Sequence, residues 1–100
     1  MAVSLSMELP DVGQAEYDAV MGHLGLGSPG VEQTQPWPDG IISHMAGAGE
    51  SAWCVVDVWE SRDAFEQFFG ERLGPALEAA GIAGPPRMTW FDVYNTYPGS

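Results

Sequence analysis

Hydrophobic and polar residues alternate along the chain in four segments, at residues 2–8, 41–46, 51–61 and 87–95. Alternation with a period of two is typical of β-strands. In two further segments apolar residues recur at the spacing of an α-helix, at residues 12–24 and 61–73. The order strand, helix, strand, strand, helix, strand predicts a ferredoxin-like α+β fold, a four-stranded antiparallel sheet with helices on one face. We expect one domain over residues 1–100, with an ordered core at about residues 2–95.

Local signals predict where the helices begin and end. Asp11 is expected to cap the first helix, with Gln14 three residues later in a loose capping box. Gly25 is expected to end that helix. Ser61 is expected to cap the second helix, and Pro75 to interrupt it and begin a further short turn.

The third predicted strand is apolar on both faces. Trp53, Asp57 and Trp59 share one face, and Val56 and Val58 lie on the other. The helices of the chain cover one face, so the second needs another layer, and a second copy of the chain is its simplest source. We assign Asp57 and its two tryptophans to the helix-free face, where dimerisation would enclose them in a pocket.

The last predicted strand is expected to point into the same enclosed space. Trp90, Asp92 and Tyr94 share one face, whereas Phe91 and Val93 suit the helix side. Tyr94 can donate a hydrogen bond to a substrate carbonyl or to a developing oxyanion. The alternative is a tyrosine at the end of the sheet with its hydroxyl in water.

Two side chains are candidates for proton transfer. His44 is a candidate general base because imidazole titrates near neutral pH. Asp57, desolvated between two indoles, is suited to proton abstraction from a phenol or an acidic C–H group. The alternative is structural: a histidine bonded to a neighbouring element, and a carboxylate satisfied by an arginine of a partner subunit or by a backbone donor.

Four tryptophans are candidates for substrate contact. Trp53, Trp59 and Trp90 could form the walls of a pocket for a flat molecule, and their alternative is packing at a dimer interface. Trp37 lies in the long connection at residues 25–40. It could close over a ligand or pack against a second subunit.

Composition excludes some classes of partner. Fourteen acidic residues against three arginines and no lysine give a net charge of −11, which repels phosphate backbones and anionic lipid. We therefore expect no nucleic-acid and no membrane partner. The sequence has no metal-ligand spacing, no phosphate-binding loop and no signal peptide. These features predict a cytoplasmic protein that works without a cofactor.

Three stretches carry a resemblance to a known family: Gly-Ile-Ile-Ser-His-Met-Ala-Gly at 40–47, Trp-Cys-Val-Val-Asp-Val-Trp-Glu-Ser at 53–61, and Arg-Leu-Gly-Pro-Ala-Leu at 72–77. Over residues 2–95 the chain resembles the antibiotic-biosynthesis-monooxygenase type of dimeric α+β barrel. The resemblance implies a homodimer that tailors a small aromatic or enolisable molecule of polyketide type without a cofactor. Proton abstraction would begin a monooxygenation, a cyclisation or an isomerisation. The alternative is a non-catalytic, ligand-binding or stress-related barrel.

The match to this family has departures. Trp59 stands where such enzymes often have a pocket tryptophan, and Asp57 stands where many have glutamate. The histidine that many members have on the following helix is replaced by Phe68, and the first strand lacks the asparagine of haem-degrading members. A haem-handling protein with His44 as the ligand is therefore the weakest of the alternatives.

Overall fold

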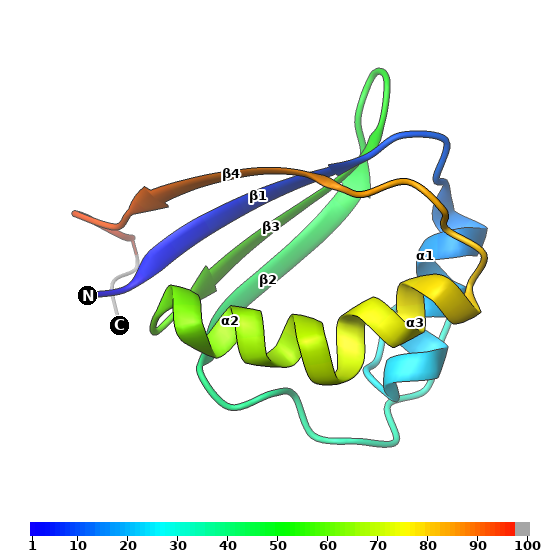
Figure 1. Ribbon diagram of the computed structural model, residues 1–100, viewed down its shortest axis with the longest axis horizontal. Coiled ribbons are helices and arrows are strands. Elements are labelled where there is room, and N and C mark those ends of the chain that lie inside the picture. Colours follow the sequence, from blue (N-terminus) through cyan, green and yellow to red (C-terminus); the bar gives the residue numbers. More distant parts are fainter. Residues whose placement is uncertain (98–100) are drawn as a thin grey trace.

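Alternating strands and two helical regions assemble as the sequence predicts. The computed structural model describes residues 1–97, with the elements β1 (Val3–Leu9), α1 (Gln14–Leu24), β2 (Ile41–Ala48), β3 (Trp53–Trp59), α2 (Arg62–Phe68), a π-helical segment η1 (Phe69–Leu73), α3 (Gly74–Ala79) and β4 (Arg87–Asp92). The four strands are antiparallel neighbours in the order β2-β3-β1-β4. All helices lie on one face of the sheet (Figure 1). The ferredoxin-like α+β prediction is confirmed.

The core lies between the sheet and the helices. Leu5, Met7 and Leu9 point from the central strand β1 into it, while Ser4 and Ser6 point to the opposite face. Three buried groups meet these strand residues, contributed by α1 (Val20, Met21, Leu24), α2 (Phe65, Phe68) and the η1–α3 region (Leu73, Ala76, Leu77). Phe65 and Phe68 are therefore core residues, as their helical spacing indicates.

The two helical regions begin and end differently from some sequence predictions. The predicted cap at Asp11 is wrong: α1 begins after Gly13, whose N–H donates to the Glu16 carboxylate at 2.7 Å. Asp11 instead adopts a left-handed backbone with φ 61°. Gly25 ends the helix at φ 77°, a conformation that glycine adopts without steric cost.

The second helical region does not break at Pro75. Ser61 caps it as predicted, accepting the Ala64 N–H at 3.1 Å. The chain then continues through α2, η1 and α3 as one helical rod (Figure 1). Pro75 lies in the first turn of α3, where its ring is tolerated because the preceding π-helical turn already alters the hydrogen-bond pattern. The predicted further short turn is present as α3, with Pro75 in its first turn, whereas the predicted break before it is wrong because η1 joins α2 to α3.

The face assigned to Asp57 and Trp59 is the main correction to the sequence analysis. Both residues point toward the protein's own helices, with 4% and 0% of their surface exposed. In the register of the sheet, Leu5 of β1 lies opposite Asp57, and Leu5 belongs to the helix-facing side. The alternation within β3 was correct, but the choice between its two apolar faces was inverted.

The same inversion affects β4. Trp90 lies opposite Leu5 and packs on Phe65 of α2 with ring centroids 5.3 Å apart, so it faces the helices. Phe91 points the other way and is 61% exposed. The strand ends at Asp92 instead of Asn95, so Tyr94 lies beyond it.

The long connection at residues 25–40 passes below the helices in the view of Figure 1, from the end of α1 to the start of β2. Its first end is held by Thr34 and Gln35, whose N–H groups both donate to the Gly25 carbonyl at 2.8 Å. Its second end is held by the Glu60 N–H, which donates to the Gly40 carbonyl at 2.7 Å. These bonds place Trp37 beside the edge strand β2.

The helix-free face of the sheet carries exposed apolar side chains in a single chain. Met45 is 65% exposed there, beside the half-buried Val56 and Val58.

Among residues 1–97, no helix is long and apolar enough to cross a bilayer.

Candidate active site

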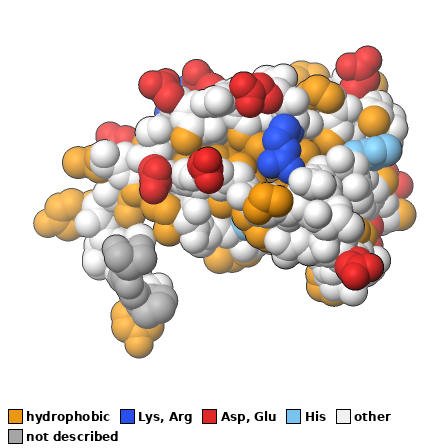
Figure 2. Space-filling model, turned by 90° about the horizontal axis from the view of Figure 1, so that it is seen from below, with side chains coloured by type: hydrophobic (Ala, Val, Ile, Leu, Met, Phe, Trp, Pro, Cys, Tyr) orange, Lys and Arg blue, Asp and Glu red, His pale blue; other side chains and the backbone are white. Residues whose placement is uncertain are grey.

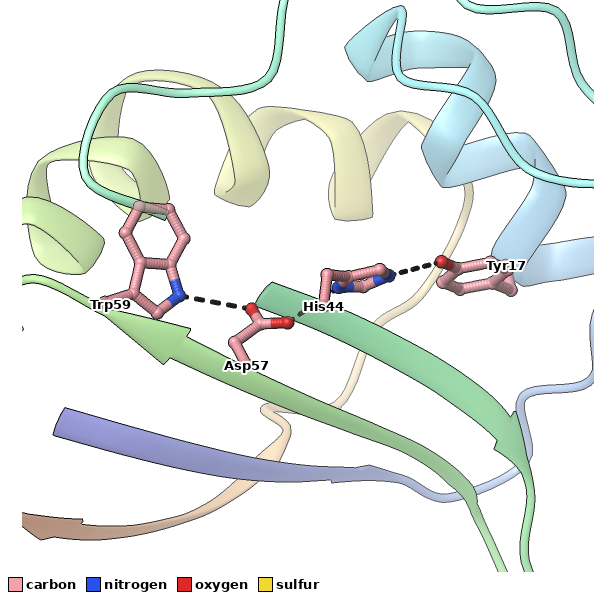
Figure 3. A network of polar contacts seen from close by, with 4 residues as sticks. All are labelled: Tyr17, His44, Asp57 and Trp59. Atoms are coloured by element: carbon pink, nitrogen blue, oxygen red, sulfur yellow. Dashed lines mark hydrogen bonds and ion pairs between the residues drawn. The ribbon is translucent and has the colours of Figure 1, made fainter. Parts of the chain in front are cut away.

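Three consecutive contacts link four side chains beneath the helices (Figure 3). The Tyr17 hydroxyl lies 2.7 Å from His44 Nε2, and His44 Nδ1 lies 2.6 Å from Asp57 Oδ1. Trp59 Nε1–H donates to the second carboxylate oxygen, Oδ2, at 3.2 Å. We call Tyr17, His44 and Asp57 the relay. A carboxylate, an imidazole and a hydroxyl in line form the arrangement in which a histidine accepts a proton while an acid orients it.

Sheet register creates the central contact. His44 of β2 and Asp57 of β3 are direct cross-strand partners, and both point toward the helices. The register shifts between Ile41 and Ser43, so a bulge in the edge strand sets the facing of His44. Tyr17 reaches the pair from the first half of α1.

Burial determines the protonation pattern that the relay favours. Asp57 is nearly inaccessible, so its carboxylate needs donors, and His44 Nδ1–H and Trp59 Nε1–H supply them. A neutral His44 with its proton on Nδ1 accepts the Tyr17 O–H at Nε2. Burial, followed by the charges of Asp57 and Asp18, raises the pKa of Tyr17 to about 12. Tyr17 is therefore a protonated phenol throughout the physiological range, and it donates to His44 Nε2 in the tautomer that carries its proton on Nδ1.

The relay separates two hollows. An inner cavity of about 50 Å³ lies between sheet and helices, with an almost wholly apolar wall that includes Met7, Leu24 and Leu77. That volume holds a few water molecules at most. Outside it, a groove of about 430 Å³ lies between α1, β2 and the connection at residues 25–40. We call this the aromatic groove, because Tyr17, Trp37, His44 and Trp53 line it.

Four of the seven residues predicted for the site belong to the relay or line the aromatic groove, and a fifth, Trp59, bonds to the relay from behind. His44 and Asp57, chosen separately in the sequence, form one hydrogen-bonded pair. Trp37 lies over His44 with ring centroids 5.2 Å apart, and it borders both the inner cavity and the aromatic groove. Trp53 lies at the far side of the groove, 5.3 Å from the Tyr17 ring.

The other three predicted residues lie elsewhere. Trp59 is fully buried and touches the relay only through its N–H, so it is not a wall of the aromatic groove. Trp90 borders a different hollow on the outer side of α2, under the guanidinium of Arg62 at 4.8 Å. Tyr94 is 102% exposed after the end of β4 and does not reach the relay.

Tyr17 is the site residue that the sequence analysis missed. Not every apolar residue of α1 is buried: Ala15 and Ala19 are exposed, and the buried residues are Val20, Met21 and Leu24. Tyr17 precedes Val20 by three residues and Met21 by four, so it belongs to the inward face. That spacing was the available signal for a polar tip entering the core.

No protein-family model and no curated protein matches the sequence. Solved structures do match it. SnoaB, a cofactor-independent oxygenase from Streptomyces nogalater, matches with a TM-score of 0.61 and 14% identity over 97% of this chain and 96% of that one. ActVA-Orf6, a monooxygenase of Streptomyces coelicolor solved in complex with nanaomycin D, matches with a TM-score of 0.54 and 22% identity over 99% and 92%.

A variant of MhuD with two manganese protoporphyrin IX molecules bound per active site also matches, with a TM-score of 0.54 and 21% identity over 99% of this chain and 100% of that one. At these identities the likeness shows the fold. The chain thus has the architecture of antibiotic-biosynthesis monooxygenases, and the predicted resemblance is confirmed at that level. Oxygenases and a porphyrin-binding protein share this fold, so the choice of chemistry depends on this chain's own side chains.

Proposed function

We propose that the protein is a cofactor-independent enzyme that removes a proton from a small aromatic or enolisable molecule bound in the aromatic groove. The observation that supports this best is the relay, in which a buried carboxylate orients a proton acceptor that lies at the wall of a groove large enough for a small organic molecule. Among the structural neighbours, SnoaB is described as a cofactor-independent oxygenase and ActVA-Orf6 as a monooxygenase, which makes a monooxygenation in natural-product tailoring the leading reaction. A cyclisation or an isomerisation begins with the same step.

In this proposal each member of the relay has a separate role. A substrate O–H or acidic C–H proton passes to the Tyr17 oxygen as the Tyr17 proton passes to His44 Nε2. Asp57 then stabilises the imidazolium through its 2.6 Å contact with Nδ1. Because Asp57 is buried behind His44, it acts as a positioning residue, and the substrate meets Tyr17 and His44. Trp37 and Trp53 hold a flat substrate against Tyr17.

Anthrone, a flat ketone with an acidic CH2 group, tests proton removal without knowledge of the natural substrate. We expect the protein to catalyse exchange of the CH2 protons with deuterated water in the absence of oxygen. In air, we expect oxygen uptake and conversion to anthraquinone. Tyr17→Phe and His44→Gln should each lower the exchange rate by about 10²–10⁴-fold, the usual contribution of a positioned acid or base.

The pH profile and a matched variant sharpen this test. The pKa of Tyr17 near 12 implies that its ionisation causes no loss of rate below about pH 11. Tyr94→Phe removes the same hydroxyl from an exposed tyrosine and should leave the rate unchanged. Exchange that is equally fast in Tyr17→Phe and the unaltered protein would rule out the relay as the proton acceptor.

A second function, a non-catalytic ligand-binding barrel, has one observation in its favour. His44 and Asp57 satisfy each other and the inner cavity is small, as a purely structural pair in a filled core requires. This function predicts ligand binding in the groove with neither proton exchange nor oxygen uptake in the anthrone experiment.

We further propose that the protein is a homodimer joined through the helix-free face of the sheet. Met45, Val56, Val58 and Phe91 present apolar surface there that the helices of one chain do not cover. A second copy would bury this surface and close two sheets into a barrel. Sedimentation should give twice the chain mass of 10.7 kDa, and Phe91→Asp should shift the species toward that single-chain mass.

A further inference from the structure

We propose that the aromatic groove is a binding site for an organic cation, an ammonium group attached to a flat, largely apolar body. That such a cation binds in the groove is independent of the proposed function. That the cation is the enzyme's substrate rests on the proposed function. Three features support it: a continuous row of aromatic rings, a carboxylate without a counter-charge, and the absence of lysine and arginine side chains from the groove.

The row of rings is formed by four side chains in contact. Trp37 lies 5.2 Å from His44, the His44 and Tyr17 rings are parallel within 7° at 6.2 Å, and Tyr17 lies 5.3 Å from Trp53 (centroid distances). All four border the groove. Indole and phenol faces carry negative electrostatic potential and attract ammonium groups, most strongly where water is displaced.

The carboxylate of Asp18 also borders the groove. It is half-buried, and its Oδ1 accepts the Ser28 hydroxyl at 2.8 Å. Within residues 1–97, neither of the ion pairs that form involves Asp18. Its Oδ2 lies beside Gly30, where an added Cβ would come within 2.9 Å of that oxygen. Residues 28–30 therefore hold the carboxylate at the edge of the groove with one oxygen free to meet a cation.

No lysine occurs in the chain, and its three arginines lie away from the groove. Arg62 pairs with Glu66, Arg72 donates to the Leu24 carbonyl, and Arg87 lies at the start of β4. None of them borders the groove. Figure 2 shows acidic side chains spread over the surface around few basic ones. An anionic ligand would be repelled here, and a neutral one would leave the Asp18 carboxylate without a counter-charge.

The position of the relay suits a ligand that carries an ammonium group at one end and an acidic O–H or C–H group at the other. An ammonium held by Asp18 and Trp37 places the far end of a flat molecule near the Tyr17 hydroxyl, since Tyr17 and Asp18 are adjacent on α1 and both border the groove. The substrate class that follows is a phenol or enolisable ketone bearing an amine.

Two molecules of the same shape test this inference directly. (3-Hydroxyphenyl)trimethylammonium and 3-tert-butylphenol differ in one atom and one charge, and calorimetric titration gives the dissociation constant of each. We expect the cation to bind at least about tenfold more tightly. Asp18→Asn can still accept the Ser28 hydroxyl. It should raise the dissociation constant of the cation about tenfold and that of the neutral phenol less than about twofold.

Two further variants separate local from general effects. Asp63→Asn removes the same charge from an exposed position on α2 and should leave both affinities unchanged. Trp37→Leu keeps an apolar side chain without the ring and should weaken the cation more than the phenol. Equal binding of the two molecules, equal effects of Asp18→Asn and Asp63→Asn, or no binding of the cation would each overturn the inference.

The inference and the proposed function fail in different ways. Cation binding that depends on Asp18, together with no proton exchange on anthrone, would support the cation site and contradict the proposed enzymatic function. Exchange on anthrone that depends on Tyr17, together with no preference for the cation, would support the proposed enzymatic function and contradict the cation site.

Discussion

Trp59→Ala should lower the free energy of unfolding by about 3–5 kcal/mol, the range for removing a fully buried large aromatic side chain. Trp59 is 0% exposed and lies with ring centroids 5.5 Å from both Phe65 and Phe68. Alanine leaves a void in the layer where β3 meets α2, and it also deprives the buried Asp57 carboxylate of the Trp59 N–H. A domain of 100 residues has roughly 5–15 kcal/mol of stability in total, so this one change removes a large share of it.

Urea denaturation followed by circular dichroism, at one protein concentration throughout, measures this loss. Trp59→Phe separates its two causes, because phenylalanine retains most of the packing and lacks the N–H donor. We expect Trp59→Phe to cost about 1–3 kcal/mol, the usual penalty for leaving a buried acceptor short of a partner. A Trp59→Ala variant as stable as the original would mean that Trp59 is not in the core, as the first interpretation of its face assumed.

Alternation along a strand can be predicted from the sequence, whereas the side of the sheet that each face of β3 occupies cannot. The alternation of β1 is unambiguous, because Ser4 and Ser6 oppose Leu5 and Met7, and the order of strands and helices along the chain is enough to predict the ferredoxin-like fold. In β3 the alternation places Asp57 and Trp59 together but cannot name their side, since both faces are apolar. The pairing of Leu5 with Asp57 resolves it, and that pairing depends on tertiary structure.

The candidate site was predictable in part for the same reason. His44 and Asp57 stand out by residue type, yet their contact requires the register between β2 and β3, including its shift after Ile41. Tyr17 is 27 residues from His44 and reaches it only when α1 packs on the sheet. Residue chemistry can be judged from the sequence alone, whereas a hydrogen-bonded chain across three elements needs the packed fold.

The relay also has a structural cost that must be separated from its chemistry. A carboxylate buried beneath the helices is stable only with its donors, whatever the protein does. Loss of stability on changing His44 therefore does not argue against catalysis. Tyr17→Phe is the more informative change for function, because the ring and its packing remain and only the hydroxyl at the groove is lost.

His44→Ala should destabilise the protein by about 3 kcal/mol, because it leaves the nearly inaccessible Asp57 carboxylate with Trp59 as its one remaining side-chain donor. Asp57→Asn should cost less, since a neutral amide is cheaper to bury than a charge. In the double variant, the carboxylate that His44→Ala orphans is already gone. The two changes together should therefore cost less than the sum of the single changes, by about 1–2 kcal/mol.

A cycle of urea denaturation curves on the original protein, the two single variants and the double variant measures this coupling. His23→Ala is the matched control, because His23 is an exposed histidine in the last turn of α1. We expect it to change stability by no more than about 0.5 kcal/mol, as is usual for a substitution at an exposed position. Strictly additive costs for His44 and Asp57 would show that the 2.6 Å contact does not stabilise the folded protein, and the carboxylate would then need another partner to explain its burial.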